Sequence, residues 1–326
     1  LSFARDGTMV YVDGRSGGNN RTLVWVDRTG REEPLSAPPR IYQNARISPD
    51  GTRIALDIRD QENDIWMWDT ARETMTRVTF DHSLDGAPVW TPDSRRIVFA
   101  SRRTGEPNLF WQPADGTGSA ERLTESSTNQ VPLAVTPSGA AIVFREMGPK
   151  TSENLMLLPL TSPRQTQALV ETVFSETNAD LSPDGRWLAY ESNESGRQEV
   201  YVRPFPDVNR GRWQVSTDGG RMPLWARMGG ELFYVSANDA LMGVRVDPGE
   251  SWRASAPVTQ FRKRYTYTSA TGLQSLNGSV FRPFDVTPDG RRFLMLKDST
   301  SDDAVPRNLL VVQHWFDELT RLVARN

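Results

Sequence analysis

Few side chains in this sequence have the chemistry of catalysis or of tight metal binding. The chain contains two histidines and no cysteine. His82 lies in the polar loop 81–85, where we expect a surface histidine rather than a base, and His314 lies in an apolar segment beside Trp315. A serine hydrolase triad and a zinc site both need more ligands or bases than these two histidines supply. We therefore expect no catalytic residue, no metal site and no cofactor.

Five aspartates recur at one position of a four-residue motif, which favours a structural role over a cluster of catalytic carboxylates. The clearest copies read Ser/Thr-Pro-Asp-Gly. Proline presets the first central position of a type I turn, aspartate suits the second, and glycine adopts the left-handed conformation that lets the next strand begin. Asp6 belongs to a looser copy, and the turn residues of the other copies are Pro49, Asp50, Gly51, Pro92, Asp93, Pro137, Gly139, Pro183, Asp184, Gly185, Pro288, Asp289 and Gly290.

The motif repeats through the chain at an interval typical of a β-propeller. With the proline position as origin, the copies fall at residues 5, 49, 92, 137, 183, 227 and 288, with spacings of 44, 43, 45, 46, 44 and 61. Short apolar runs bounded by turn residues follow the copies, whereas helical repeats would need longer stretches with a 3.6-residue period. A period in the low to mid forties built from short strands predicts one four-stranded antiparallel blade per repeat.

The repeat predicts an all-β propeller of seven blades that forms a single domain over residues 1–326. Six blades are the alternative, if the first, incomplete repeat joins the last. Met9–Val12 and Leu23–Asp27 read as the second and third strands of the first blade, and Phe316–Val323 reads as a short C-terminal amphipathic helix. The predicted blades span approximately residues 1–40, 41–82, 83–126, 127–173, 174–217, 218–262 and 279–326, with an insertion at 262–278.

The sequence begins within the repeat pattern, so we expect a fragment of a longer protein. Leu1–Ala4 reads as the inner strand of the first blade, without an initiator methionine or a signal peptide ahead of it. Asn308–Trp315 reads as the third strand of the seventh blade. We expect a strand upstream of Leu1 to complete that last blade.

Charge and hydropathy argue against two classes of partner. Lysine and arginine number 38 against 41 aspartates and glutamates, and the formal net charge of -3 gives no general attraction for nucleic acid. No apolar run reaches the roughly 20 residues of a membrane-spanning helix. We expect a monomeric domain that neither binds nucleic acid nor inserts into a membrane, and the absence of cysteine leaves the compartment open.

A ligand is expected where the loops that lead into the inner strands meet at one mouth of the central channel. The ligand could be a protein, a peptide or a small molecule, and the candidate residues are chosen by their place in the repeat. They are Tyr42, Gln43, Asn44, Asp85, Asn129, Gln130, Asn178, Arg221 and Arg282. The basic run Arg262–Arg264, with Tyr265 and Tyr267, is a weaker candidate for an anionic partner, because charge runs in insertions usually face solvent.

The turn motif and its strands resemble the TolB-type (WD-like) propeller repeat over essentially the whole chain. Phrases such as Leu23–Arg28, Val202–Pro206, Trp213–Ser216 and Trp315–Leu319 resemble one subgroup more closely. This subgroup is the propeller region that follows the kinase domain, usually beyond a membrane-spanning helix, in many bacterial serine/threonine protein kinases. No kinase motif occurs in this chain, so the resemblance implies no phosphoryl transfer by its residues.

Three functions fit the sequence. The resemblance implies a non-catalytic binding or scaffold module, serving as the sensor or interaction domain of a bacterial kinase-like protein, with an extracytoplasmic location suspected and a cytoplasmic one open. The second is a free periplasmic assembly protein like TolB. The third is a propeller hydrolase or lyase with a channel active site, which would hold a divalent cation among channel carboxylates. The reading frame upstream of Leu1 would separate the first two.

Overall fold

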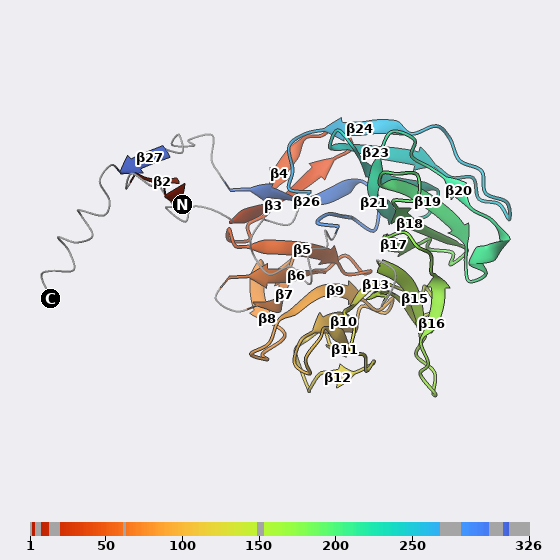
Figure 1. The fold of residues 1–326 in the computed structure, drawn as a ribbon, viewed down its shortest axis with the longest axis horizontal. Helices are drawn as coiled ribbons and strands as arrows, with labels where there is room; N and C mark the ends of the chain where they lie inside the picture. The colour runs from red at the N-terminus through yellow and green to blue at the C-terminus, as the bar shows by residue number, and fades with distance from the viewer. Residues whose placement is uncertain are drawn as a thin grey trace, which may run out of the picture. The chain divides into compact units, whose positions relative to one another are not determined.

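The computed structural model describes residues 2–3, 8–12, 20–60, 63–148, 153–267, 282–299 and 309–312. The chain divides into two compact units, one of Arg21–Lys297 and a smaller one that combines Leu1–Asn20 with Asp298–Asn326. Six four-stranded antiparallel sheets make up the larger unit and follow one another around a ring (Figure 1). The predicted all-β propeller is confirmed, and the helix predicted at 316–323 lies outside the described residues.

Five blades are each built from four consecutive strands. Within each blade the first strand is innermost, because the first strands of neighbouring blades contact one another around the ring. The blades are β5 (Tyr42–Ile47), β6 (Arg53–Arg59), β7 (Asn63–Asp69) and β8 (Thr74–Arg77); β9 (Asp85–Trp90), β10 (Arg96–Ser101), β11 (Asn108–Pro113) and β12 (Glu121–Arg122); β13 (Gln130–Val135), β14 (Ala141–Met147), β15 (Glu153–Pro159) and β16 (Gln167–Val170); β17 (Glu176–Leu181), β18 (Trp187–Ser192), β19 (Glu199–Pro204) and β20 (Trp213–Gln214); β21 (Gly220–Trp225), β22 (Glu231–Ser236), β23 (Ala240–Arg245) and β24 (Val258–Arg262).

The sixth blade, called here the closing blade, combines strands from distant parts of the chain. Its order is β25 (Asp285–Val286), β26 (Arg292–Asp298), β3 (Arg21–Asp27) and β4 (Glu32–Pro34), and in Figure 1 the red β3 lies beside the blue β26. The prediction of seven blades was wrong, and its alternative of six is confirmed, because Leu23–Asp27 pairs with the last repeat instead of the first. The strands that complete the last repeat are thus β3 and β4, not a strand upstream of Leu1.

The smaller unit contains a three-stranded antiparallel sheet. Its order is β1 (Ser2–Phe3), β2 (Met9–Val12) and β27 (Leu309–Val312). Val10 of β2 pairs with Val311 of β27 on one side and with Ser2 of β1 on the other. The segments expected in the first and the seventh blades therefore pair with each other.

The hydrophobic core of the ring is divided among the joints between blades. A blade inside a propeller packs on both faces, so its strands carry apolar side chains on both sides. At the joint between the closing blade and the β5–β8 blade, Leu23, Leu294 and Ile54 are fully buried in one cluster. Comparable apolar clusters fill the other joints, and burial at these joints holds the ring together.

The repeated turns join the first and second strands and form a second set of contacts between blades. In the turn at Ser48, the Gly51 N–H donates to the Ser48 carbonyl at 2.8 Å, and the Asp50 carboxylate accepts the Ser48 hydroxyl at 2.6 Å. Gly51 has a φ of +75°, and a Cβ there would lie 3.2 Å from Cγ of Pro288 in the turn of the closing blade. The turn residues therefore pack against neighbouring turns at the end of the ring opposite the mouth.

Candidate binding sites

Buried carboxylates hold together the mouth of the ring, where the inner strands begin. The inner strands β5, β9, β13, β17 and β21 each shift register against their second strand, and a bulge of this kind leaves a residue unpaired in the ladder. Asp57 on β6 accepts the N–H of Ala87 on β9 at 2.9 Å, and Glu191 on β18 accepts that of Met222 on β21 at 2.7 Å. Each carboxylate therefore joins its own blade to the inner strand of the next.

Asp57 also forms a buried ion pair with Arg59 of the same strand. The side chains are 1% and 5% exposed, and Arg59 Nη2 lies 3.0 Å from Asp57 Oδ2. Arg59 Nη1 donates to the Asp85 carbonyl at 3.0 Å, which extends the pair to the next blade. A Cβ on Gly86 would lie 2.0 Å from Arg59 Nη2, so the ion pair occupies the space that any larger residue at position 86 would need.

Two carboxyl groups of the mouth have unusual proton affinities because they are poorly solvated. Burial raises the pKa of Glu191 to about 7, although the Met222 N–H and the Asn178 amide donate to it and favour its charged form. Burial also raises the pKa of Asp85, although the Arg103 guanidinium lies 2.8 Å away. The Glu191 carboxyl therefore titrates near neutral pH.

The residues predicted to bind a ligand do not form one surface. Tyr42 lies in the core and its hydroxyl donates to the Pro38 carbonyl at 2.5 Å. Arg221 forms an ion pair with Asp239, and Asp85 forms one with Arg103. Tyr42 packs in the apolar joint beside the closing blade, whereas the ion pairs of Arg221 and Asp85 lie within their own blades. Gln43 is partly buried at the start of β5.

Two neighbouring predicted residues have different surroundings. Asn129 is 4% exposed, and neither polar atom of its amide has a hydrogen-bond partner among the described residues. Gln130 is also buried, and its amide N–H donates to Glu146 at 2.6 Å. Gln130 therefore belongs to a cleft on the flank of the ring, described below.

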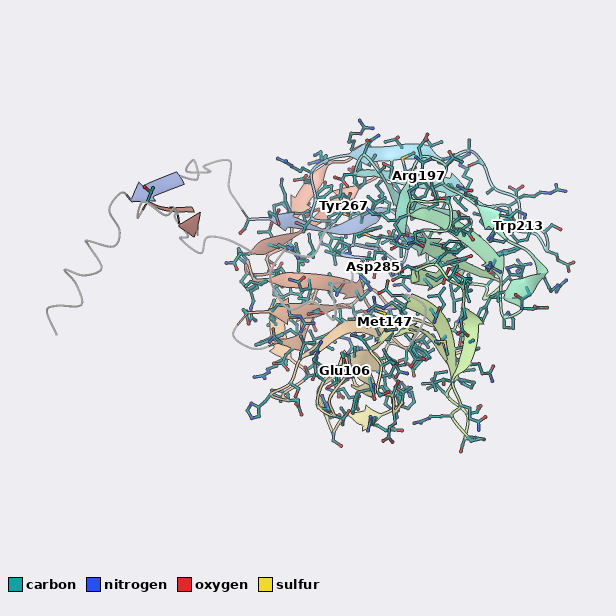
Figure 2. The ribbon with its side chains drawn as sticks, viewed as in Figure 1. Glu106, Met147, Arg197, Trp213, Tyr267 and Asp285 are labelled. Atoms are coloured by element: carbon teal, nitrogen blue, oxygen red, sulfur yellow. The ribbon has the colours of Figure 1, made fainter. Side chains whose placement is uncertain are left out.

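The other three predicted residues, Asn44, Asn178 and Arg282, line one cavity on the ring axis together with Arg46. The inner strands β5, β9, β13 and β17 all contribute to its wall, and it offers about 20 Å³. This space suits one water-sized species and excludes a peptide or an organic ligand. Figure 2 places Asp285, from β25, near the centre of the ring.

A much larger cleft of about 690 Å³ lies between the β9–β12 and β13–β16 blades. Its walls carry hydroxyl, amide, carboxylate and guanidinium groups, and Leu123 and Leu158 add apolar surface. The polar residues that line it are Arg122, Thr124, Glu125, Ser126, Gln130, Glu146, Arg164, Gln165 and Thr166. This cleft, and not the axis, offers the volume for a ligand of several residues.

One carboxylate of this cleft is held rigidly by its neighbours. Oε1 of Glu146 accepts three hydrogen bonds, from the hydroxyls of Ser126 and Thr128 at 3.0 Å each and from the Gln130 amide at 2.6 Å. The Gln130 oxygen in turn accepts the Thr124 hydroxyl at 2.5 Å. This network fixes the Glu146 side chain before any ligand binds.

Comparison with known proteins identifies the family. Residues 2–164, half of the chain, match the TolB beta propeller domain (PD40). The chain belongs to the TolB β-propeller family. An uncharacterized protein of Agrobacterium fabrum is 37% identical over 98 residues, which cover 30% of this chain and 33% of that protein. The Tol-Pal system protein TolB of Helicobacter pylori is 28% identical over 149 residues, which cover 44% of this chain and 35% of TolB. The chain thus spans about a third of the length of these relatives.

Solved structures share the fold of this TolB-family propeller. A protein assigned as TolB from Agrobacterium tumefaciens superposes with a TM-score of 0.65 at 15% identity, over 86% of this chain and 99% of that one. An oligogalacturonate lyase in complex with manganese superposes with a TM-score of 0.57 at 16% identity, over 90% and 86%. Identities this low show a common fold and no more.

The described part of this TolB-family chain contains no group of three histidine, aspartate or glutamate side chains placed to hold a metal ion. His82 is exposed, and His314 lies outside the described residues. Tyr265 and Tyr267, next to the basic run, pack into the apolar joint beside the closing blade, while Arg262, Lys263 and Arg264 are exposed. No described segment forms a helix long and apolar enough to cross a membrane.

Charged residues near the axis of this TolB-family ring share equivalent positions of the repeat, a pattern that a search for catalytic motifs does not detect. They occupy the repeat position three residues before the turn proline, which is apolar in the other blades. Arg46, Asp180 and Asp285 stand where the remaining blades have Val89, Ala134 and Leu224. Asp57 and Glu191 likewise share the position eight residues after the turn proline. Comparing equivalent positions of the repeat would have identified both sets of charged residues.

Proposed function

We propose that this TolB-family propeller is a non-catalytic binding module, and that it holds an extended segment of a partner protein in the cleft between the β9–β12 and β13–β16 blades. The observation that carries the proposal is the volume of that cleft, about 690 Å³, against about 20 Å³ at the axis. A ligand that reached the axis would have to displace Arg46 and Arg282, whereas the cleft accepts one without rearrangement.

The edge of the β9–β12 blade supports an extended ligand. β12 is the outermost strand of its sheet, and Arg122 at its end lines the cleft. Because β12 is only two residues long, it limits an added strand to a short stretch of backbone pairing. An exposed strand edge offers backbone N–H and carbonyl groups to an added strand. Polar side chains on both sides of the cleft can then recognise the side chains of the bound segment.

The charges of the cleft favour a segment that carries both signs. Arg122 and Arg164 pair with Glu125 at 3.9 Å and Glu121 at 2.7 Å, and all four side chains are substantially exposed. Exposed pairs contribute little to stability, so an acidic side chain of a ligand can replace Glu121 or Glu125 at low cost. The fixed carboxylate of Glu146 provides an acceptor for a basic or amide group.

We infer that this propeller is the sensor or interaction domain of a bacterial serine/threonine kinase-like protein and lies on the extracytoplasmic side of the membrane. The support is the resemblance of Leu23–Arg28, Val202–Pro206 and Trp315–Leu319 to propeller regions that follow kinase domains. The test is the reading frame upstream of Leu1, where a kinase domain followed by a membrane-spanning helix is expected. A signal peptide without a kinase would overturn this part and favour the alternative of a free periplasmic assembly protein. One relative is a Tol-Pal system protein, TolB.

Selection of displayed peptides from a random library tests the binding proposal, because it requires no identified partner. Peptides are selected on the wild-type domain, and their affinity is measured by fluorescence anisotropy for Thr166→Arg and Thr104→Arg. Both threonines are exposed, but only Thr166 lines the cleft. We expect Thr166→Arg to weaken binding at least tenfold and Thr104→Arg to leave it unchanged.

Two results would count against this function. Selected peptides that bind both variants equally would place the binding surface elsewhere on the ring. Turnover of oligogalacturonate by the purified domain with manganese would show that the module is catalytic, as the lyase of the same fold is.

A further inference from the structure

The three-stranded sheet of the smaller unit is built on the plan of a propeller blade. In all six blades of the ring, five residues connect the inner strand to the second strand, as residues 48–52 do between β5 and β6. Five residues, 4–8, likewise connect β1 to β2. β27 pairs with the other edge of β2, where every blade of the ring has its third strand. The sheet therefore contains the first three strands of a blade that is not one of the six.

The sequence of this sheet follows the repeat as well. Residues 4–7, between β1 and β2, read Ala-Arg-Asp-Gly, a looser copy of the turn motif. Asn308 is followed by Leu309, the first residue of β27, and four third strands of the ring have a polar residue before an apolar one at the same place. These pairs are Asp64-Ile65, Asn108-Leu109, Asn154-Leu155 and Glu199-Val200. β27 is therefore a third strand by its sequence and by its pairing.

The strands of this sheet have the composition of strands that are covered on both faces. β2 reads Met-Val-Tyr-Val and β27 reads Leu-Leu-Val-Val, without a polar residue between apolar ones. Neighbouring residues of a strand belong to opposite faces, and an antiparallel sheet with one face in water alternates apolar with polar residues. In the ring, Ile97, Val98 and Phe99 of β10 form such an apolar run and are all fully buried between neighbouring blades. The smaller sheet therefore requires a packed layer on each face.

We propose that this sheet is a blade of a second TolB-type propeller, and that the blades that cover it come from the part of the polypeptide that precedes residue 1. In the ring, the chain enters the inner strands β9, β13, β17 and β21 from the fourth strand of the blade before. By the same plan, β1 is entered from the fourth strand of a preceding blade. Blades of this kind supply the two apolar faces that the sheet requires, because a propeller blade buries its faces only between neighbours.

A second ring of this kind is interrupted in sequence by the first. The chain leaves the smaller sheet after β2, runs through all six blades from β3 to β26, and returns to the sheet at β27. The closing blade of the described ring is assembled in a similar way, since it combines β25 and β26 with β3 and β4 from the opposite end of the larger unit. The sheet of β1, β2 and β27 therefore closes the second ring with strands that lie before and after the first ring in the sequence.

Amide hydrogen exchange tests the proposal, by comparison of the full natural protein with residues 1–326 alone. A small sheet without packing on its faces is at best marginally stable. We expect the amides of β2 and β27 to exchange at least about 100-fold more slowly in the full protein than in the shorter chain. The amides of β6, whose neighbouring blades are present in both proteins, are the control and should exchange at the same rate in both. Equal rates for β2 and β27 in the two proteins would overturn the proposal.

Two further results decide the same question. Exchange in the 1–326 chain that slows with rising protein concentration would show that a second copy covers the sheet, and would overturn the proposal. The reading frame ahead of residue 1 should contain at least three copies of the turn motif, at spacings of about 43 to 46 residues, because a propeller has at least four blades. A frame without such copies would also overturn it, whether or not a kinase domain is present, so this result is separate from the test of the kinase assignment.

Discussion

Replacing Gly86 with alanine should break the joint between the β5–β8 and β9–β12 blades. The new Cβ would lie 2.0 Å from Arg59 Nη2 and 2.6 Å from Asp57 Oδ2, distances that no carbon atom tolerates. Arg59 can leave, but Asp57 is fully buried and would lose its partner. Loss of one partner from a buried ion pair costs about 3 to 5 kcal/mol. We therefore expect Gly86→Ala to lower the free energy of unfolding by about that amount.

The assay is urea unfolding followed by the fluorescence of the ten tryptophans. Gly249→Ala is the matched control, because a Cβ there would meet its nearest atoms at 3.7 and 3.9 Å. The control should change the free energy of unfolding by no more than about 0.5 kcal/mol.

A double-mutant cycle separates ion-pair loss from a general effect of the added methyl group. If Gly86→Ala acts by expelling Arg59, then Arg59→Ala, Gly86→Ala and the double variant should cost similar amounts. The sum of the two single-variant losses in unfolding free energy would then exceed the loss in the double variant by about 2 kcal/mol or more. Additive costs, or a Gly86→Ala variant as stable as Gly249→Ala, would refute the reasoning.

Three further predictions concern single positions. The pKa of Glu191 is raised from 4.5 to about 7, so the folded state holds the Glu191 proton more tightly than the unfolded state does. The protonated Glu191 carboxyl therefore contributes its full stabilisation below pH 4.5, and this stabilisation is lost as the pH rises through 7. Its size is at most about 3 kcal/mol. Thermal unfolding at pH 5 and pH 8 should show this loss in wild type and not in Glu191→Gln. Gly51→Ala should lower the free energy of unfolding, measured in urea, more than Gly229→Ala does. The two glycines have nearly the same φ, +75° and +76°, but only the Cβ at position 51 would meet a neighbour, Pro288 at 3.2 Å. Equal losses in the two variants would argue against packing between turns. Arg28→Lys should lower the free energy of unfolding by about 1 to 2 kcal/mol. Lysine cannot donate to Glu231 and to the Gly290 carbonyl while it also stacks on Phe233, as Arg28 does. An unchanged urea midpoint would show that a positive charge at position 28 is enough for stability.

The fold was predictable from the sequence up to the point where the ring closes. The turn at Ser48 and its copies fix the blade, because local hydrogen bonds and the left-handed glycine act within a few residues. Closure depends on which second strand pairs with Leu23–Asp27, and both Met9–Val12 and Arg292–Asp298 follow a turn of the same kind. Sequence order favours the first, whereas the structure uses the second and buries Leu23 with Leu294.

The candidate sites were predictable only in part, for a similar reason. Asn44, Asn178 and Arg282 were chosen by their place in the repeat and do share one cavity. The flank cleft arises between two blades, from residues such as Arg122 and Glu146 that no local spacing relates. Among the lining residues of this cleft, only Gln130 occupies the repeat position from which the candidate mouth residues were chosen. A site built between repeats thus escapes an analysis that treats each repeat alone.

Departures from the repeat are the informative positions in this ring. Where the blades share a residue, as in the turns, the role is common to all and therefore structural. At the axis the shared residue is apolar, as Val89, Ala134 and Leu224 show, and a charge there must be balanced by another charge in the same small space. Asp180 pairs with Arg282 and Asp285 with Arg227, and the Arg46 guanidinium donates to the carbonyls of Ala45 and Arg282. The charges at the axis therefore join blades to one another, whereas the flank cleft offers the volume for a polypeptide.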